Sequence, residues 1–132
     1  MTERLPNQRP SILVVEDDDI LCSILSEYFK SDDWHVFEAG DGHQALQLIK
    51  ENHERIGIVI FDRRMPVLSG SDMFRQSYRQ YPDIHYVMLS GTTHDQEIVD
   101  LLANGLNAFM TKPVLRDELL ELVNELLGLN PS

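Results

Sequence analysis

The stretch ILVVEDDD, residues 12–19, joins four apolar residues directly to four acidic ones. A short β-branched run of this length is typical of a strand that is buried on both faces. Carboxylates at the edge of a dry core are costly to keep ionised, and neighbouring carboxylates repel one another. A buried strand that ends in a block of acids therefore needs a compensating partner, which the rest of the chain has to identify.

The remainder of the chain alternates between apolar runs and helical periodicity. Further strands are predicted at 34–39, 56–61, 84–89 and 107–110, and helices within 18–31, 40–54, 70–80, 95–104 and 115–127. Continuous apolar strands separated by helices imply a parallel sheet that helices cover on both faces. The sequence therefore predicts an α/β protein built from five βα units.

Length and composition favour one small domain. The chain has 132 residues and a formal charge of −11, which makes direct nucleic-acid binding a poor expectation because phosphate backbones are also negative. The single cysteine, Cys22, falls at helical spacing from Leu25 and Phe29 and is predicted to fill the core. No signal peptide and no apolar run long enough to span a membrane is evident, so we expect a soluble, cytoplasmic protein without membrane contact.

The ends of the chain differ from its middle. Residues 1–10 are polar and contain two prolines, and we expect them to form a flexible arm. Residues 11–127 are predicted to form the folded domain. Residues 128–132 contain a glycine and a proline, which end helices, and are either a tail or the start of a linker.

Polar residues close four of the predicted strands. Glu16 and Asp17 follow the first strand, Asp62 follows the third, Ser90 the fourth, and the fifth runs to Lys112. Ligands of an open parallel sheet bind beyond the carboxyl ends of its strands, so these side chains are expected to meet at one edge.

Each of these residues also has an ordinary explanation. Asp18 and Asp19 are expected to cap the following helix or to interact with its dipole. Asp62 and Ser90 suit tight turns, and a lysine such as Lys112 usually stays in water. The functional interpretation gains weight because the four strand ends fit one mechanism.

Three carboxylates at one place require a cation. Oxygen-only ligands favour a hard metal, and few ligands with room for water favour Mg²⁺ over Ca²⁺. The five histidines are scattered without ligand spacing, which argues against zinc. A carboxylate can attack phosphorus to form an aspartyl phosphate, and Mg²⁺, the Lys112 ammonium and the Ser90 hydroxyl would then stabilise the phosphoryl oxygens.

Four motifs occur in the order typical of one family. They are ILVVEDD (12–18), FDRRMPVLSG (61–70), MLSG (88–91) and FMTKPV (109–114). With them the chain resembles a response-regulator receiver domain of two-component signalling over roughly residues 11–127. The resemblance implies a doubly wound, flavodoxin-like (βα)5 fold with a five-stranded parallel sheet of order 2-1-3-4-5.

The resemblance also implies a role for seven residues. It makes Asp62 the phosphoacceptor, Glu16 and Asp17 the acidic pair for Mg²⁺, Arg64 a metal ligand through its backbone carbonyl, Ser90 the switch hydroxyl, Lys112 the lysine that contacts the phosphoryl group, and Phe109 the aromatic switch. Phe109 stands where tyrosine is commoner and has no hydroxyl, so only a packing switch is open to it.

Two arginines directly follow the predicted acceptor. One hypothesis is that Arg64 alters the access of water to the acyl phosphate and so changes its lifetime. The alternative is that Arg63 and Arg64 are both solvated surface charges, since long cationic side chains usually remain in water.

The predicted function is a phosphorelay switch. The domain would take a phosphoryl group from a sensor histidine kinase or phosphotransfer protein and change the surface formed by 95–104, 107–110 and 115–127. That surface would control a partner protein or an attached output domain, and homodimers through it are possible. The chain would catalyse only its own phosphorylation and dephosphorylation.

Two other function classes compete with the switch. A phosphorylation-independent adaptor would keep the fold alone, and loss of Asp62 or Lys112 would have favoured it. A phosphatase with a nucleophilic aspartate would need a second acid two residues later, where Arg64 stands.

Overall fold

The computed structural model describes residues 9–92 and 95–129. Most of the predicted arm (1–10) and of the predicted tail (128–132) lies outside these residues. Within the described residues, strands and helices alternate along the whole domain. They are β1 Ser11–Val15, α1 Asp19–Lys30, β2 Val36–Ala39, α2 Gly42–Asn52, β3 Ile56–Asp62, α3 Gly70–Gln80, β4 His85–Ser90, α4 Gln96–Ala103, β5 Ala108–Thr111 and α5 Arg116–Leu126.

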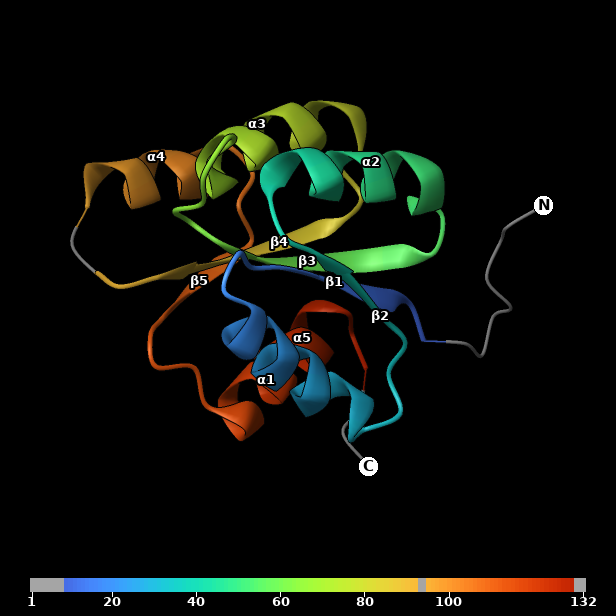
Figure 1. The fold of residues 1–132 in the computed structure, drawn as a ribbon. Helices are drawn as coiled ribbons and strands as arrows, with labels where there is room; N and C mark the ends of the chain where they lie inside the picture. The colour runs from blue at the N-terminus through green and yellow to red at the C-terminus, as the bar shows by residue number, and fades with distance from the viewer. Residues whose placement is uncertain (1–8, 93–94, 130–132) are drawn as a thin grey trace.

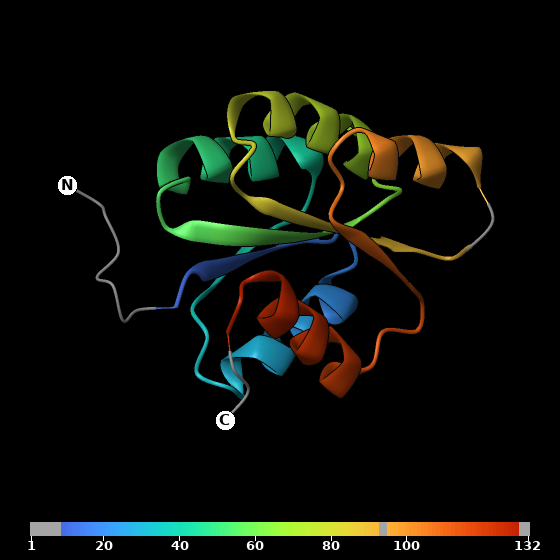
Figure 2. The ribbon, with the colours of Figure 1, turned by 180° about the vertical axis from the view of Figure 1, so that it is seen from behind.

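The five described strands form one sheet in the order β2-β1-β3-β4-β5, and each pair of neighbours is parallel. Helices α2, α3 and α4 cover one face of the sheet, and α1 and α5 cover the other (Figure 1). The view from behind shows the same two helical layers (Figure 2). The predicted α/β class, the parallel sheet and the strand order are confirmed.

The core lies on both sides of the sheet because successive strand residues point to opposite faces. Every residue of β1 is buried. Leu13 and Val15 join the cluster under α2, α3 and α4, whereas Ile12 and Val14 join the cluster under α1 and α5. The apolar run at the start of the chain therefore supplies both cores.

Short polar side chains cap α1, α2, α3 and α4, whereas α5 has no side-chain cap among the described residues. The Asp18 side chain accepts hydrogen bonds from the Ile20 and Leu21 backbone N–H groups, and Asp19 lies in the first turn of α1. The expected roles of these two acids are confirmed. Asp41 caps α2 and Asp95 caps α4 in the same way.

The apolar residues of α1 divide between two faces. Cys22 is buried with Leu25 and Phe29, as predicted. Ile20 and Ile24 belong to the same apolar repeat but are 75% and 43% exposed. A helical period of three and four residues accommodates two overlapping stripes, and only packing against the sheet selects one of them.

Trp34 is anchored at the start of β2, and strand pairing begins only at Val36. Its indole is buried, meets Phe29 edge to face, and donates a hydrogen bond to the Asp32 carboxylate at 3.3 Å. The Arg9 guanidinium lies 4.3 Å from the centre of the Trp34 ring. The strand predicted at 34–39 therefore begins only at Val36, and its first two residues belong to the irregular segment between α1 and β2.

Candidate functional site

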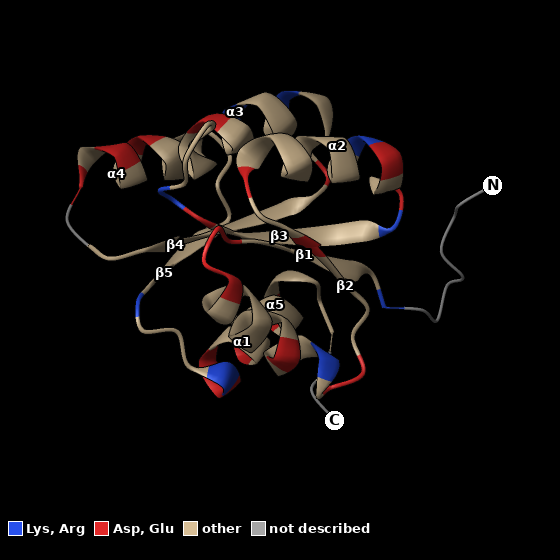
Figure 3. Ribbon diagram, viewed as in Figure 1, with Lys and Arg blue, Asp and Glu red and all other residues tan. Residues whose placement is uncertain are grey.

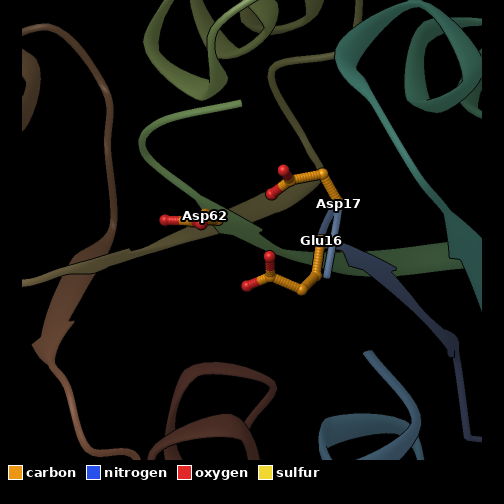
Figure 4. Close-up of side chains that lie close together, drawn as sticks. All are labelled: Glu16, Asp17 and Asp62. Atoms are coloured by element: carbon orange, nitrogen blue, oxygen red, sulfur yellow. The ribbon is translucent and has the colours of Figure 1, made fainter. Parts of the chain in front are cut away.

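Strands β1 and β3 bring three carboxylates together. Val15 pairs with Phe61 in the sheet, so Glu16 and Asp62, the residues that follow them, end neighbouring strands. One oxygen from each of Glu16, Asp17 and Asp62 lies within 4.8 Å of the others. Figure 4 shows the Glu16 and Asp17 side chains leaving the end of β1 and extending toward the side on which the Asp62 carboxylate lies.

The three acids differ in burial. Glu16 is only 2% exposed and Asp62 8%, whereas Asp17 is exposed. Glu16 Oε2 accepts a hydrogen bond from the Asp18 backbone N–H at 3.1 Å. Glu16 Oε1 is buried without a hydrogen-bond partner among the described residues. A buried, unsatisfied carboxylate oxygen beside two further carboxylates suits a site for a hard cation.

Lys112 is the cation that the fold places against this cluster. Its Nζ lies 3.2 Å from Asp62 Oδ1 and 3.9 Å from Glu16 Oε1. The Lys112 backbone N–H donates to the Ser90 carbonyl at 2.9 Å, which holds the end of β5 against β4. The Lys112–Pro113 peptide bond is cis. One lysine therefore contacts two of the three carboxylates, and the site keeps an excess of negative charge.

The excess of negative charge at this site affects the pKa of Glu16. Burial raises the pKa of Glu16 to about 7, and the Asp62 charge and an interaction with Asp17 also raise it. The Asp18 N–H and the Lys112 ammonium act in the opposite direction but do not restore an ordinary value. A divalent cation among these oxygens would remove the repulsion, so the donor set, the burial and the electrostatics all fit a metal such as Mg²⁺.

A hollow of about 270 Å³ opens beside the acids, at the ends of β3, β4 and β5. It is lined by Asp62, Arg63, Arg64, Ser90, Gly91, Thr92 and Lys112. The Ser90 side chain is buried, and its hydroxyl accepts a hydrogen bond from the Thr92 backbone N–H at 3.2 Å. Ser90 thus shapes a turn, as its ordinary explanation proposed, and also borders the hollow.

Phe109 lies in β5, where it pairs in register with Met88 of β4. Its ring is partly buried and packs against the core cluster beneath α2, α3 and α4. The structure therefore places the predicted aromatic switch on the strand that leads to Lys112, next to the strand that ends in Ser90.

The expectation that Arg63 and Arg64 are both solvated charges is wrong for Arg63. Arg64 is exposed, and its backbone N–H lies 3.5 Å from Asp62 Oδ1. The Arg63 side chain is only 11% exposed, and it forms ion pairs of 2.8 Å with both Asp95 and Glu97. The loop after β3 turns Arg63 toward the first turn of α4, where ion pairs with two acids replace the hydration of its guanidinium.

Asp95 and Glu97 were missed as partners of this loop. The only sequence signal is the position of Asp95 as a helix cap, which says nothing of a partner more than thirty residues away. Figure 3 shows a basic segment of the loop after β3 close to the acidic start of α4. The contact depends on how the crossover places α4 over the sheet, which residue spacing alone does not determine.

Comparisons with known proteins also point to a receiver domain. The chain matches the response regulator receiver domain over residues 12–124. It is 34% identical to a response regulator receiver protein from Pseudomonas putida, with a TM-score of 0.81 over 89% of this chain and 98% of that one. A receiver domain protein from Clostridium thermocellum gives a TM-score of 0.86 at 25% identity, over 91% of this chain and 95% of that one.

Longer proteins also contain a matching segment. The chain is 30% identical over 117 residues to the sensor kinase CckA of Brucella abortus, which covers 89% of this chain and 12% of CckA. It is 28% identical over 116 residues to the response regulator SaeR of Staphylococcus aureus, which covers 88% of this chain and 50% of SaeR. The chain thus spans half of SaeR and a small part of CckA.

The chain belongs to the response regulator receiver domain family. Receiver domains are signalling domains of two-component systems. None of the described helices is long and apolar enough to cross a membrane.

Proposed function

We propose that this domain is a phosphorelay switch that accepts a phosphoryl group on Asp62 from a phosphohistidine of a sensor kinase or phosphotransfer protein. The observation that supports this most directly is the convergence of Glu16, Asp17 and Asp62 within 4.8 Å, with Lys112 Nζ at 3.2 Å from Asp62. A nucleophilic carboxylate, a cation beside it and an open hollow are what phosphoryl transfer requires.

The transfer is a single displacement at phosphorus. An Asp62 carboxylate oxygen bonds to the phosphorus while the bond to the histidine nitrogen breaks, and the imidazole keeps the bonding electron pair. Lys112 compensates negative charge at the Asp62 side, and the Ser90 hydroxyl donates to a phosphoryl oxygen. Glu16, Asp17, Asp62 and the Arg64 carbonyl would hold Mg²⁺, which neutralises the phosphoryl oxygens when bound.

The output would follow from local rearrangement. Movement of Ser90 toward the phosphoryl group vacates space that Phe109 can enter, and the surface of α4, β5 and α5 changes with it. Val99 and Leu102 of α4 are 57% and 40% exposed, which gives this surface apolar contacts for a partner protein, an output domain or a second copy. A cytoplasmic location fits a phosphoryl donor of this kind.

Phosphorylation can be tested without knowledge of the kinase. The full chain is incubated with acetyl phosphate in Mg²⁺ or in EDTA, and its intact mass is recorded beside that of Asp62→Asn. We expect a gain of one phosphoryl group that requires both Mg²⁺ and Asp62. A folded wild-type chain that gains no mass would favour the phosphorylation-independent adaptor instead.

Arg64 is proposed to control the lifetime of the acyl phosphate. Its side chain is exposed and lines the hollow beside Asp62, on the path that a hydrolytic water would take. Arg64→Ala should therefore change the dephosphorylation rate, measured as loss of the added mass after removal of acetyl phosphate. An unchanged rate would remove this proposal.

A further inference from the structure

Arg63 joins the phosphoacceptor loop to the start of α4. Its Nη2 lies 2.8 Å from Asp95 Oδ2, and its Nε donates a hydrogen bond to Glu97 Oε1 at 2.8 Å. We name this set of contacts, between Arg63, Asp95 and Glu97, the Arg63 clamp. A guanidinium that bridges two carboxylates has a fixed geometry, which a single lysine could not reproduce.

The acids of the Arg63 clamp are themselves held in place. The Asp95 carboxylate also caps α4 by accepting from the Glu97 backbone N–H at 2.8 Å. Glu97 accepts a hydrogen bond from the Ser71 hydroxyl at 3.0 Å and lies 3.5 Å from the Arg75 guanidinium, both on α3. The first turn of α4 is thus fixed to α3 and to the loop after β3 by charge-assisted contacts.

Arg63 is equally well fixed at its backbone. Its N–H donates to the Leu89 carbonyl at 3.1 Å, and its carbonyl accepts from the Gly70 N–H at 2.9 Å. It follows Asp62 directly, and Arg63 is among the residues that line the same hollow as Ser90 and Lys112. The residue that holds α4 therefore also faces the space in which a phosphoryl group on Asp62 would lie.

We propose that Arg63 is a positioning residue whose contacts with Asp95 and Glu97 hold α4 in the unphosphorylated arrangement, so that the Arg63 clamp opposes the switch. This inference rests on the proposed function of Asp62. A phosphoryl group on Asp62 would place a dianion beside Arg63 and compete with Asp95 and Glu97 for the guanidinium. Release of α4 is then favoured by phosphorylation, and by linkage a weakened clamp favours phosphorylation.

The proposal predicts two effects of breaking the clamp. Hydrogen exchange of the α4 amides in the unphosphorylated full chain should become about fivefold faster in Arg63→Gln and in Glu97→Gln, because each variant removes a contact to the first turn. Phosphorylation by acetyl phosphate, followed by intact mass, should become faster by a similar factor. The effect of the double variant should be smaller than the sum of the two single effects, since Arg63 and Glu97 share one interaction.

Two further variants separate the clamp from general effects on α4. Asp95→Asn keeps a helix-capping side chain but loses the charge that faces Arg63, so it should behave as Glu97→Gln does. Asp100 is an exposed acid on the same helix, and its carboxylate accepts a hydrogen bond from Gln96. Asp100→Asn should leave the exchange rate of α4 and the phosphorylation rate at wild-type values.

The outcomes are distinct. Wild-type exchange of α4 in both Arg63→Gln and Glu97→Gln would overturn the proposal. So would a changed phosphorylation rate in Arg63→Gln alone, because Arg63 would then act directly in the hollow. If the wild-type chain takes no phosphoryl group, the proposed function fails, and the exchange rates alone decide whether Arg63 restrains α4.

Discussion

Two groups of carboxylates at the carboxyl ends of the strands differ in how far nearby cations compensate their negative charge. Glu16 and Asp62 share Lys112, Asp17 lies beside them, and burial together with repulsion from Asp62 raises the pKa of Glu16 to about 7. Asp95 and Glu97 share Arg63. The hydrogen bond from Arg63 lowers the pKa of Asp95, and burial of Glu97 would raise its pKa but is outweighed by hydrogen bonds from Arg63 and Ser71.

The difference separates a binding site from a structural contact. The charges of the Arg63 clamp are satisfied by the protein itself, so their arrangement stabilises the resting fold. The cluster of Glu16, Asp17 and Asp62 is left with excess negative charge and a buried oxygen without a hydrogen bond. Such an imbalance costs stability, and a bound cation would relieve it.

Removal of Lys112 should have the largest effect on this comparison. Lys112→Gln leaves the acids without their cation, and phosphorylation by acetyl phosphate should slow about 100-fold because one stabilising charge at the reacting group is lost. Arg116→Gln is the matched control, since Arg116 pairs with Asp117 and Ser31 outside the hollow. Equal phosphorylation rates in the two variants would contradict a role for Lys112.

The charge of Glu16 should make the metal-free protein less stable as pH rises. The folded state holds a proton on Glu16 up to about pH 7, whereas the unfolded chain releases it near 4.5, so stability falls between these values. In EDTA, Glu16→Gln should gain about 1–2 kcal/mol over wild type at pH 8 and little at pH 5, after allowance for partial solvation.

Urea unfolding across this pH range measures the difference. Glu121→Gln, which removes an exposed acid from the middle of α5, is the control and should follow the wild-type curve. Mg²⁺ should reduce the advantage of Glu16→Gln at pH 8. A gain that is the same at both pH values would show that the Glu16 carboxylate is not destabilised by its charge.

The Arg63 clamp should show the opposite pH dependence. Because the pKa values of Asp95 and Glu97 are lowered in the folded state, the stability that they contribute is present at neutral pH and is lost on acidification. Arg63→Gln should therefore destabilise the chain near neutral pH, with a deficit that shrinks as the pH falls below the ordinary carboxyl range. A deficit independent of pH would point to lost packing instead of lost charge pairing.

The smallest effect on stability is expected at Val67, in the loop between β3 and α3 that also contains Arg63. Val67 has a φ of 71°, a left-handed conformation that is unfavourable for a β-branched residue, and it is 81% exposed. Val67→Gly should stabilise the chain by about 0.5 kcal/mol, as relief of strain exceeds the added freedom of the unfolded chain. Val99→Gly, in α4, should destabilise it; a loss in both variants would contradict strain at Val67.

The sequence was most informative where local pattern and tertiary structure agree. Gly70–Gln80 forms a helix with the predicted bounds, and the apolar run before Asp62 forms the central strand β3. The exposure of Ile20 was not predictable, because the helical repeat of α1 fits two faces. The strand β2 begins late because the Trp34 side chain packs under α1, a choice that depends on the neighbouring helix.

The candidate site was predictable to the extent that strand ends determine it. In a parallel sheet, Glu16, Asp62 and Lys112 must meet if each follows a strand, and the structure brings them together. Their chemical roles stay predictions. The pairing of Arg63 with Asp95 was beyond the sequence, since the loop after β3 and the start of α4 meet only through the three-dimensional path of the crossover.

The position of the single tryptophan has a practical consequence. Trp34 lies before β2, at the amino end of the sheet, and the candidate site lies at the carboxyl ends of the strands. Its fluorescence should change when the indole loses its contacts with Phe29 and Arg9 on unfolding. A ligand at Asp62 should leave this fluorescence nearly unchanged. The molecule thus carries a built-in optical reporter of unfolding, and a second indole introduced at Phe109 would add a signal from the switch that can be recorded separately.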